Sequence, residues 1–283
     1  MKTLATLKKD LEFNKGLSSL IEVLKAIAVS QYHILEQKLK TYERLLVGIE
    51  NFFEFVDVPA VAHPFLNPKN KVQGVVAVTS DSGLLGSLNM QVINAALLEL
   101  EKIPGKLIVI GERGKNYVRD TSVPFVSFPG IIDEERIVQA LQMRDYLVAE
   151  ALKGTFDYLK VVYPKPISFT VQRIEVVPFL PFVPTLKPQA QGEFIPEVSL
   201  ESELPDILEY LVYLWMGQKL YEIFGYARMS EFASRFVHLE ESAQKLKELD
   251  TKTRLEYFRV RHELVDRNMR ELFAARLLFS SSQ

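Results

Sequence analysis

Apolar residues at the start of the chain recur at alternating steps of three and four, the spacing of a heptad seam on one face of an α-helix. No proline occurs between Met1 and Val58. One helix of about 50 residues can therefore run through this region, with a length of about 75 Å. We predict an N-terminal coiled-coil helix over residues 1–57. Its expected seam consists of Leu4, Leu7, Leu11, Leu17, Leu20, Leu24, Ile27, Gln31, Leu35, Tyr42, Leu45 and Ile49.

The end of the chain repeats this pattern. After Pro205 there is again no proline, which predicts a second long helix over residues 204–283. Two long helices that each carry one apolar face bury these faces most simply against each other, so we expect an antiparallel coiled coil. The seam of the second helix is expected at Met229, Phe232, Phe236, Leu239, Ala243, Leu246, Thr253, Tyr257, Val260 and Leu264.

The middle of the chain has a different pattern, because all but one of the 14 prolines lie between Pro59 and Pro196. Short runs rich in β-branched residues predict strands, and helical stretches alternate with several of them. This alternation indicates βαβ units on a largely parallel sheet. The predicted fold class is therefore α/β, with an α/β domain over residues 70–190 inserted between the two long helices. Residues 178–196 form a linker or an extended edge. The predicted strands are Val75–Thr79, Leu107–Gly111, Val123–Phe128, Leu159–Tyr163 and Val171–Val177, and the helices are Asn89–Lys102, Lys115–Arg119 and Glu134–Lys153.

Composition narrows the classes of function. The 34 Lys and Arg residues and 36 Asp and Glu residues leave a net charge of −2, so no basic field is available to attract nucleic acid. The absence of cysteine excludes disulfides, thiolate metal sites and a Cys nucleophile, and it favours a reducing compartment. Charged residues interrupt the N-terminal segment, which argues against a signal peptide, and the apolar runs are too short to span a bilayer. We expect a soluble protein that reaches a membrane only through a complex.

Two glycine-containing loops are candidates for phosphate binding, because each follows a predicted strand and precedes a helix. The first contains Gly83 and Gly86, and the second contains Gly111 and Gly114. Neither has the three-glycine dinucleotide fingerprint or the GK[ST] ending of a P-loop. Tight packing between strand and helix is the favoured interpretation of the first loop, nucleotide binding is disfavoured at the second, and we expect no cofactor.

No other pattern predicts catalysis. The four histidines occur singly, without a ligand pair at helical spacing, so a metal site is not expected. The acidic pairs Glu134–Glu135 and Glu240–Glu241 lie in helical stretches rich in Lys and Arg, which favours a solvated face over an acid–base pair. The serines do not form a GxSxG elbow.

The C-terminal tail, LFAARLLF at residues 272–279, is apolar on nearly all sides. A free helix end is usually polar, so such a tail requires apolar surroundings. It either packs on its own domain or inserts into an apolar collar of a partner. We favour the collar, because the predicted helix extends beyond any core that the α/β domain could offer.

Three motifs in the same order resemble the gamma subunits of F-type ATP synthases. The segment VTSDSGLLGSLN at residues 78–89 is similar to the family signature ITSDRGLCGGLN. Val162 and Tyr163 followed by VPFLP at 177–181 resemble a second family motif, and MSEFASR at 229–235 resembles a third. The resemblance covers nearly the whole chain and implies a non-catalytic rotor shaft with a Rossmann-like inserted domain.

The resemblance also implies partners and contact residues. The shaft would turn inside a hexamer of alpha and beta subunits, while its foot would bind the membrane c-ring and the epsilon subunit on the cytoplasmic face of the membrane. Arg261 and His262 match the Arg-Gln pair that contacts beta, and Leu24 lies where many members carry a methionine close to that contact. The collar contacts would be Leu272, Phe273, Leu277, Leu278 and Phe279, and the foot contacts would be Phe194, Ile195, Glu197 and Tyr42.

The first helix departs from the common family pattern. The segment IEVLKAIAVSQY at residues 21–32 replaces the usual TKAMxMVAASKL run, and Glu22 stands in place of a lysine. Ser30, Gln31 and Tyr32 are more similar to the alternative subfamily that is linked with sodium transport. The ion site belongs to the ring, so this chain alone does not identify the transported ion.

Three hypotheses of function therefore stand. The first is the mechanical shaft of an ATP synthase, in which the rotating asymmetric rod biases the conformation of each beta subunit in turn. The second is a Rossmann-like nucleotide-binding enzyme with a coiled-coil dimerisation arm and a phosphate at Gly83 and Gly86. The third is a free coiled-coil adaptor. Nucleotide binding by the purified chain separates the first two.

Overall fold

The computed structural model describes residues 2–52, 63–183 and 203–280, with side chains described to Leu39 in the first helix and to Arg276 in the last. Within these ranges the chain forms two compact units. One contains residues 1–27 and 236–283, and the other contains residues 28–235. Each unit is described by itself below.

The larger unit contains a five-stranded sheet in the order β3-β2-β1-β4-β5. The first four of these strands pair in parallel, and β5 pairs antiparallel with β4. The prediction of a largely parallel sheet is therefore confirmed, and the segment from residue 178 begins as an edge strand. The strands are β1 (Gln73–Val78), β2 (Gly105–Ile110), β3 (Phe125–Phe128), β4 (Tyr158–Pro166) and β5 (Gln172–Leu180).

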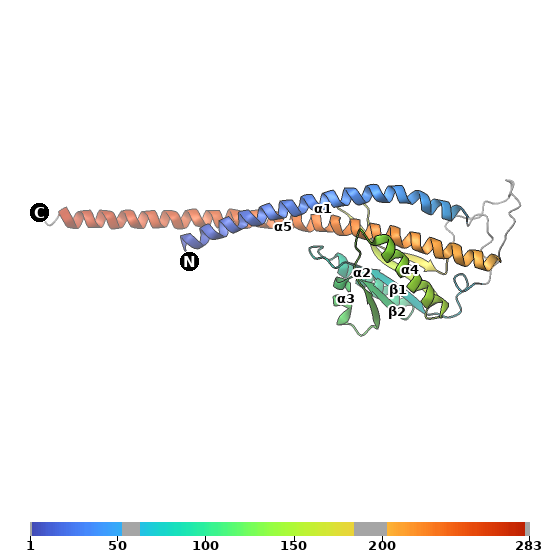
Figure 1. The fold of residues 1–283 in the computed structure, drawn as a ribbon. Coiled ribbons are helices and arrows are strands. Elements are labelled where there is room, and N and C mark those ends of the chain that lie inside the picture. Colours follow the sequence, from blue (N-terminus) through green and yellow to red (C-terminus); the bar gives the residue numbers. More distant parts are fainter. Residues whose placement is uncertain (1, 53–62, 184–202, 281–283) are drawn as a thin grey trace. The chain divides into compact units, whose positions relative to one another are not determined.

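Helices cover both faces of this sheet (Figure 1). Because successive side chains of a strand point to opposite faces, Val75 and Ala77 face one layer, and Val76 and Val78 face the other. The first layer contains α2 (Leu88–Lys102) and α3 (Glu112–Arg119). The second contains α4 (Arg136–Leu152) and part of the last helix, α5 (Leu204–Ser280).

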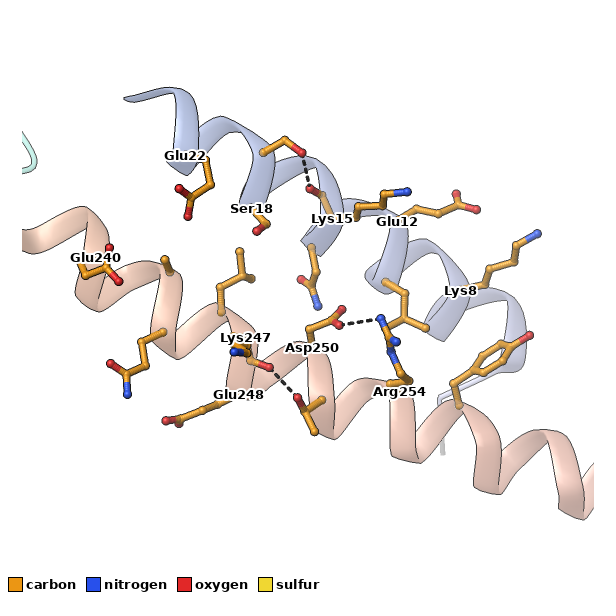
Figure 2. A pocket seen from close by; sticks show the side chains of 18 residues that line it. Lys8, Glu12, Lys15, Ser18, Glu22, Glu240, Lys247, Glu248, Asp250 and Arg254 are labelled. Atoms are coloured by element: carbon orange, nitrogen blue, oxygen red, sulfur yellow. Dashed lines mark hydrogen bonds and ion pairs between the residues drawn. The ribbon is translucent and has the colours of Figure 1, made fainter. Parts of the chain in front are cut away.

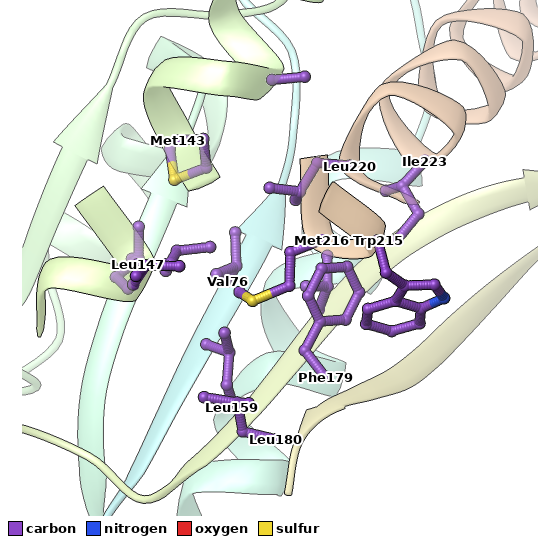
Figure 3. Packing of buried hydrophobic residues seen from close by; sticks show 14 of the residues in the cluster. Val76, Met143, Leu147, Leu159, Phe179, Leu180, Trp215, Met216, Leu220 and Ile223 are labelled. Carbon is purple, nitrogen blue, oxygen red and sulfur yellow. The ribbon is translucent and has the colours of Figure 1, made fainter. Parts of the chain in front are cut away.

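The core between the sheet and α5 is the larger of the two apolar cores (Figure 3). Met216 and Leu220 of α5 are fully buried between the sheet and α4, and Trp215 packs against Phe179 of β5 with ring centroids 5.2 Å apart. A side chain of this size contributes roughly 1.5–3 kcal/mol when it is fully buried. This core therefore fixes the N-terminal part of α5 to the sheet.

The smaller unit is built from the beginning of α1 (Leu4–Phe52) and the C-terminal part of α5. Ile21 of α1 shares one buried cluster with Leu239 and Leu246 of α5, and Leu17, Leu24 and Ala243 pack on it. The two terminal helices thus pair through their seams, as the spacing predicts, but Leu264, which was expected in the α5 seam, is exposed.

The position of the α1 seam differs from the prediction at three points. Leu20, Ile27 and Gln31 were expected in the seam, but they are exposed, and Ile21, Ala28 and Tyr32 are buried instead. The buried positions Leu7, Asn14, Ile21, Ala28 and Leu35 follow a strict seven-residue period. Since Leu20–Ile21 and Ile27–Ala28 are adjacent pairs, the three–four spacing fits either member of each pair, and contact with α5 selects one.

None of the helices in the described parts of the chain is both long enough and apolar enough to cross a membrane.

Candidate functional site

The far end of α5 is the most exposed part of the smaller unit. α1 begins at Leu4, and α5 continues through Ser280, so the last turns of α5 have no stretch of α1 to pair with. Every side chain from Arg261 to Arg276 is exposed. Five exposed apolar residues of this part of α5 follow steps of three, four or seven and so form one stripe: Leu255, Phe258, Val265, Met269 and Leu272.

Arg261 and His262 both lie on this exposed stretch, next to each other in sequence. Among the described residues, Arg261 has no hydrogen bond or ion pair, whereas its neighbour Arg259 forms an ion pair with Glu263 at 3.3 Å. A free guanidinium presents five N–H donors in a planar fork, which suits a carboxylate or carbonyl of another chain. This position is therefore available to a partner.

The predicted collar residues lie further along the same helix. Leu272 and Phe273 are 67% and 61% exposed, so the described side chains of the tail do not pack on the chain's own core. Leu277, Leu278 and Phe279 belong to α5, but their side chains lie outside the described part.

Leu24 occupies a different environment. It is half buried and packs on the Ile21, Leu239 and Leu246 cluster. Arg261 follows Leu246 on α5 at a distance of about 22 Å along the helix axis. The structure therefore does not bring Leu24 together with Arg261 and His262, and Leu24 contributes to the seam.

The predicted foot falls outside the described residues. Phe194, Ile195 and Glu197 lie outside them, and so does the side chain of Tyr42, although its backbone belongs to α1.

The loop after β1 is held by its own side chains. Asp81 accepts hydrogen bonds from the backbone N–H groups of Glu112, at the start of α3, and of Gly130, at 2.7 and 3.1 Å. Asn89 of α2 donates to Ser80 Oγ at 2.9 Å and accepts from the Ser80 backbone N–H at 3.1 Å. Asp81 and Asn89 thus tie the loop after β1 to α3 and α2. A phosphate at the start of α3, which follows the second glycine loop, would meet the Asp81 carboxylate, so this geometry disfavours nucleotide binding there.

The second glycine loop is equally tight. Gly111 has φ of +101°, a conformation that other residues rarely adopt, and a Cβ there would lie 2.7 Å from the Thr79 backbone. The backbone N–H of Gly114 donates to Thr79 Oγ1 at 3.1 Å. Both glycines therefore serve the close packing of α3 against β1.

The MSEFASR segment at residues 229–235 anchors α5 to the α/β domain. Ser230 Oγ donates to the carbonyl of Pro164 in β4 at 2.9 Å, and Ser234 Oγ lies 3.2 Å from Gln172 Oε1 in β5. The motif is recognisable in sequence, but its partners are more than 60 residues away in the chain. Sequence alone therefore does not indicate what it contacts.

A buried ion cluster lies beside this motif. The Arg228 guanidinium donates to both oxygens of Asp133, at 3.2 and 3.0 Å, and to Glu231 at 2.6 Å. Glu231 is 3% exposed, and its burial raises the pKa of the carboxyl to about 7, against the opposing effect of Arg228 and Arg235. The carboxylates in turn raise the pKa of Arg228, which stays charged despite its burial.

Two arginines of α4 also reach α5. Arg136 lies over the Tyr221 ring at 4.4 Å and donates to its hydroxyl at 2.8 Å. Arg144 lies over the Tyr213 ring at 3.6 Å, and Asp145 accepts from both side chains. These two buried arginines were not predicted, because arginine in a helix usually indicates a solvated face.

A polar groove runs between α1 and α5 in the smaller unit (Figure 2). Its volume is about 1180 Å³, and both helices line it with acidic and basic side chains. Lys8, Lys15, Lys247 and Arg254 alternate there with Glu12, Glu22, Glu240 and Asp250. A surface of such mixed charge does not favour a ligand of either sign.

The arrangement defines a class of protein. An α/β domain is inserted between two long helices that pair at their far ends, and the most available side chains lie on a helix end instead of in a pocket. Surfaces of this kind act through contacts with other chains.

Comparison with known proteins identifies the family. The family model for ATP synthase matches residues 3–275. The ATP synthase gamma chain of Symbiobacterium thermophilum is 28% identical over 75% of this chain and 75% of its own length, and that of Syntrophobacter fumaroxidans is 23% identical over 96% and 97%. The chain therefore belongs to the ATP synthase family, and the relatives to which it is similar are gamma chains.

Solved structures share the fold. A chain of the Euglena gracilis mitochondrial ATP synthase, from a structure of its OSCP, F1 and c-ring parts, matches with a TM-score of 0.66 and 14% identity, over 99% of this chain and 95% of that chain. A chain of the central stalk and c-ring structure from Tetrahymena thermophila matches with a TM-score of 0.61 and 19% identity, over 79% and 99%. The predicted fold class is thereby confirmed.

Proposed function

We propose that this chain is a non-catalytic rotor that couples ion flow through a membrane c-ring to ATP synthesis or hydrolysis in a hexamer of alpha and beta subunits. The observation that carries this role is the exposed end of α5, which presents an apolar stripe and the free Arg261 guanidinium on a helix without a partner in the described chain. The chain would bind other subunits and bias their conformations, and those subunits would carry out the ATP chemistry.

The partner contacts follow from the same surface. Arg261 and His262 would bind the beta subunit, while Leu272, Phe273, Leu277, Leu278 and Phe279 would enter the collar of alpha and beta. Phe194, Ile195, Glu197 and Tyr42 would contact the c-ring and the epsilon subunit. The chain would then lie at the cytoplasmic face of the membrane and touch the membrane only through the complex. The similarity of Ser30, Gln31 and Tyr32 to the sodium-linked subfamily supports membership of that subfamily, whereas the ion itself is determined by the ring.

The second hypothesis, a nucleotide-binding enzyme, has less support. Asp81 occupies the start of α3, and Gly111 and Gly114 after β2 serve packing. We expect the purified chain neither to bind nor to turn over nucleotide.

The test of the rotor function uses Arg261→Ala in the reconstituted complex, with Arg259→Ala as a matched control for the loss of charge. A charge-assisted hydrogen bond contributes about 1.5–3 kcal/mol, so its loss should weaken the contact by roughly 10- to 100-fold. Because Arg261 is exposed, the unfolding free energy of the chain should change by no more than about 0.5 kcal/mol.

The measurements are ATP hydrolysis, ATP-driven ion pumping and thermal unfolding. We expect Arg261→Ala to lower the number of ions pumped per ATP with unchanged unfolding, and Arg259→Ala to behave as wild type. If Arg261→Ala pumps ions and hydrolyses ATP at wild-type rates, Arg261 is not part of the coupling contact.

A further inference from the structure

The α/β domain contacts both long helices within the larger unit. On the α1 side, Phe169 from the turn between β4 and β5 packs edge-on against Tyr32, with ring centroids 4.9 Å apart, and parallel to the ring of His33 at 6.5 Å. On the α5 side, the polar contacts at this level lie between Arg228 and Ser234. Tyr32 and Phe232 belong to one buried cluster, so the two sets of contacts lie at the same level of the helix pair.

The polar contacts with α5 come from three separate segments of the domain. β4 accepts a hydrogen bond from Ser230, β5 contacts Ser234, and the turn before α4 supplies Asp133 to Arg228. Contacts with three segments resist displacement of the helix better than one contact would. Of these, only the Arg228–Asp133 contact is a bidentate ion pair.

The geometry of this ion pair suits the transmission of rotation. A bidentate contact between two planar groups fixes orientation as well as distance, whereas apolar side chains can shift past each other. The guanidinium also lies well outside the Cα cylinder of α5, whose radius is about 2.3 Å, and a force applied further from the axis resists twist more effectively. Glu231 holds Arg228 from the same helix at 2.6 Å, so the guanidinium is fixed on both sides.

We propose that Arg228, held by Asp133 and Glu231, is the positioning residue through which the α/β domain and α5 turn as one body. This role rests on the rotor function proposed above. It assigns a mechanical purpose to the ion cluster beside the MSEFASR segment, and it predicts that loss of the Asp133 contact makes the shaft more compliant without preventing assembly.

The primary test is Asp133→Asn in the full reconstituted complex. This change removes the bidentate ion pair but leaves Arg228 bound to Glu231. Glu134→Gln is the matched control, because it neutralises the adjacent, exposed carboxylate. Asp133→Glu, which keeps a carboxylate, is the rescue variant. The chain contains no cysteine, so Asn116→Cys on the exposed surface of α3 provides a unique attachment point for a rotation probe.

The readouts are the width of the angular distribution of the probe, with the hexamer fixed to a surface, and ion pumping against an increasing gradient. We expect Asp133→Asn to broaden the angular distribution and to lose pumping at a gradient that wild type sustains. Its melting temperature and its ATP hydrolysis without load should be unchanged. Glu134→Gln should match wild type, and Asp133→Glu should recover most of the wild-type width.

An unchanged width in Asp133→Asn, or an equal broadening in Glu134→Gln, would overturn the role of this ion pair. If Asp133→Asn lowers the melting temperature, Arg228→Lys decides instead, because lysine keeps the charge beside Glu231 but lacks the planar fork. A wild-type width in Arg228→Lys would then overturn the proposal. A wild-type complex that hydrolyses ATP without pumping ions would refute the rotor function itself, which is a distinguishable result.

Discussion

Leu246 and Leu255 lie nine positions apart on α5 and test which side of this helix is internal. Leu246 is 8% exposed in the seam with Ile21 and Leu239, and Leu255 is 67% exposed on the unpaired stripe. Leu246→Ala and Leu255→Ala delete the same atoms from the same helix with the same change in helix propensity. A difference between them therefore reports the packing of each face.

The magnitudes follow from the surroundings. Deletion of a buried leucine side chain to alanine costs about 2–5 kcal/mol, and the seam cluster is small, so Leu246→Ala should fall near the lower limit, at about 2 kcal/mol. Leu255→Ala should change the unfolding free energy of the free chain by no more than about 0.5 kcal/mol. In the assembled complex the order should reverse, because Leu255 belongs to the stripe that we assign to partners.

The assays are urea unfolding of the free chain and titration of the chain into a hexamer of alpha and beta subunits. An equal loss of stability in both variants would show that the stripe is already covered within the chain. A neutral Leu246→Ala would show that the paired seam does not contribute to the fold. Either result would contradict our assignment of internal and external faces.

Two further predictions concern the α/β domain. Burial raises the pKa of Glu231 to about 7, above its ordinary value, so the folded state binds this proton more tightly than the unfolded state does. Its contribution to stability is therefore complete below about pH 4.5 and declines as the pH rises through 7, by at most about 1.4 kcal/mol per pH unit. Thermal unfolding of Glu231→Gln between pH 5 and 8 should lack this decline, and an identical pH profile in wild type and variant would contradict the assignment. Asp81→Ala leaves the N–H groups of Glu112 and Gly130 without their acceptor and should cost about 1–3 kcal/mol, measured by urea unfolding. An Asp81→Ala chain that is as stable as wild type would refute the structural role of this loop.

The sequence predicted the elements well where local pattern determines them. The β-branched runs became strands within a few residues of the predicted limits, and the prolineless ends became α1 and α5. The predicted helix at Lys115–Arg119 begins earlier, at Glu112, because Asp81 accepts the N–H at its start. That contact joins residues 31 positions apart and has no local signal.

The sequence could not predict which polar residues are buried. Asn14 lies in the α1 seam, and Arg136 and Glu231 lie in the interior, although all three residue types are usually exposed. Their burial depends on partners from distant segments, such as Tyr221 for Arg136. Apart from Leu272 in the tail, the exposed apolar stripe on α5 was also not predicted. A second apolar face of a helix can be recognised only when it is known which face packs against another helix.

The pairing of the two chain ends has a consequence for biosynthesis. Ile21 and Leu239 meet in one cluster although their positions differ by 218 residues. At a synthesis rate of about 5–20 residues per second, Ile21 waits for roughly 10–40 s before its partner is made. During this time α1 presents an apolar face, and the α/β domain also lacks the α5 residues that complete its larger core. The smaller unit therefore forms only after α5 is made, and the nascent N-terminal helix exposes its apolar face until then.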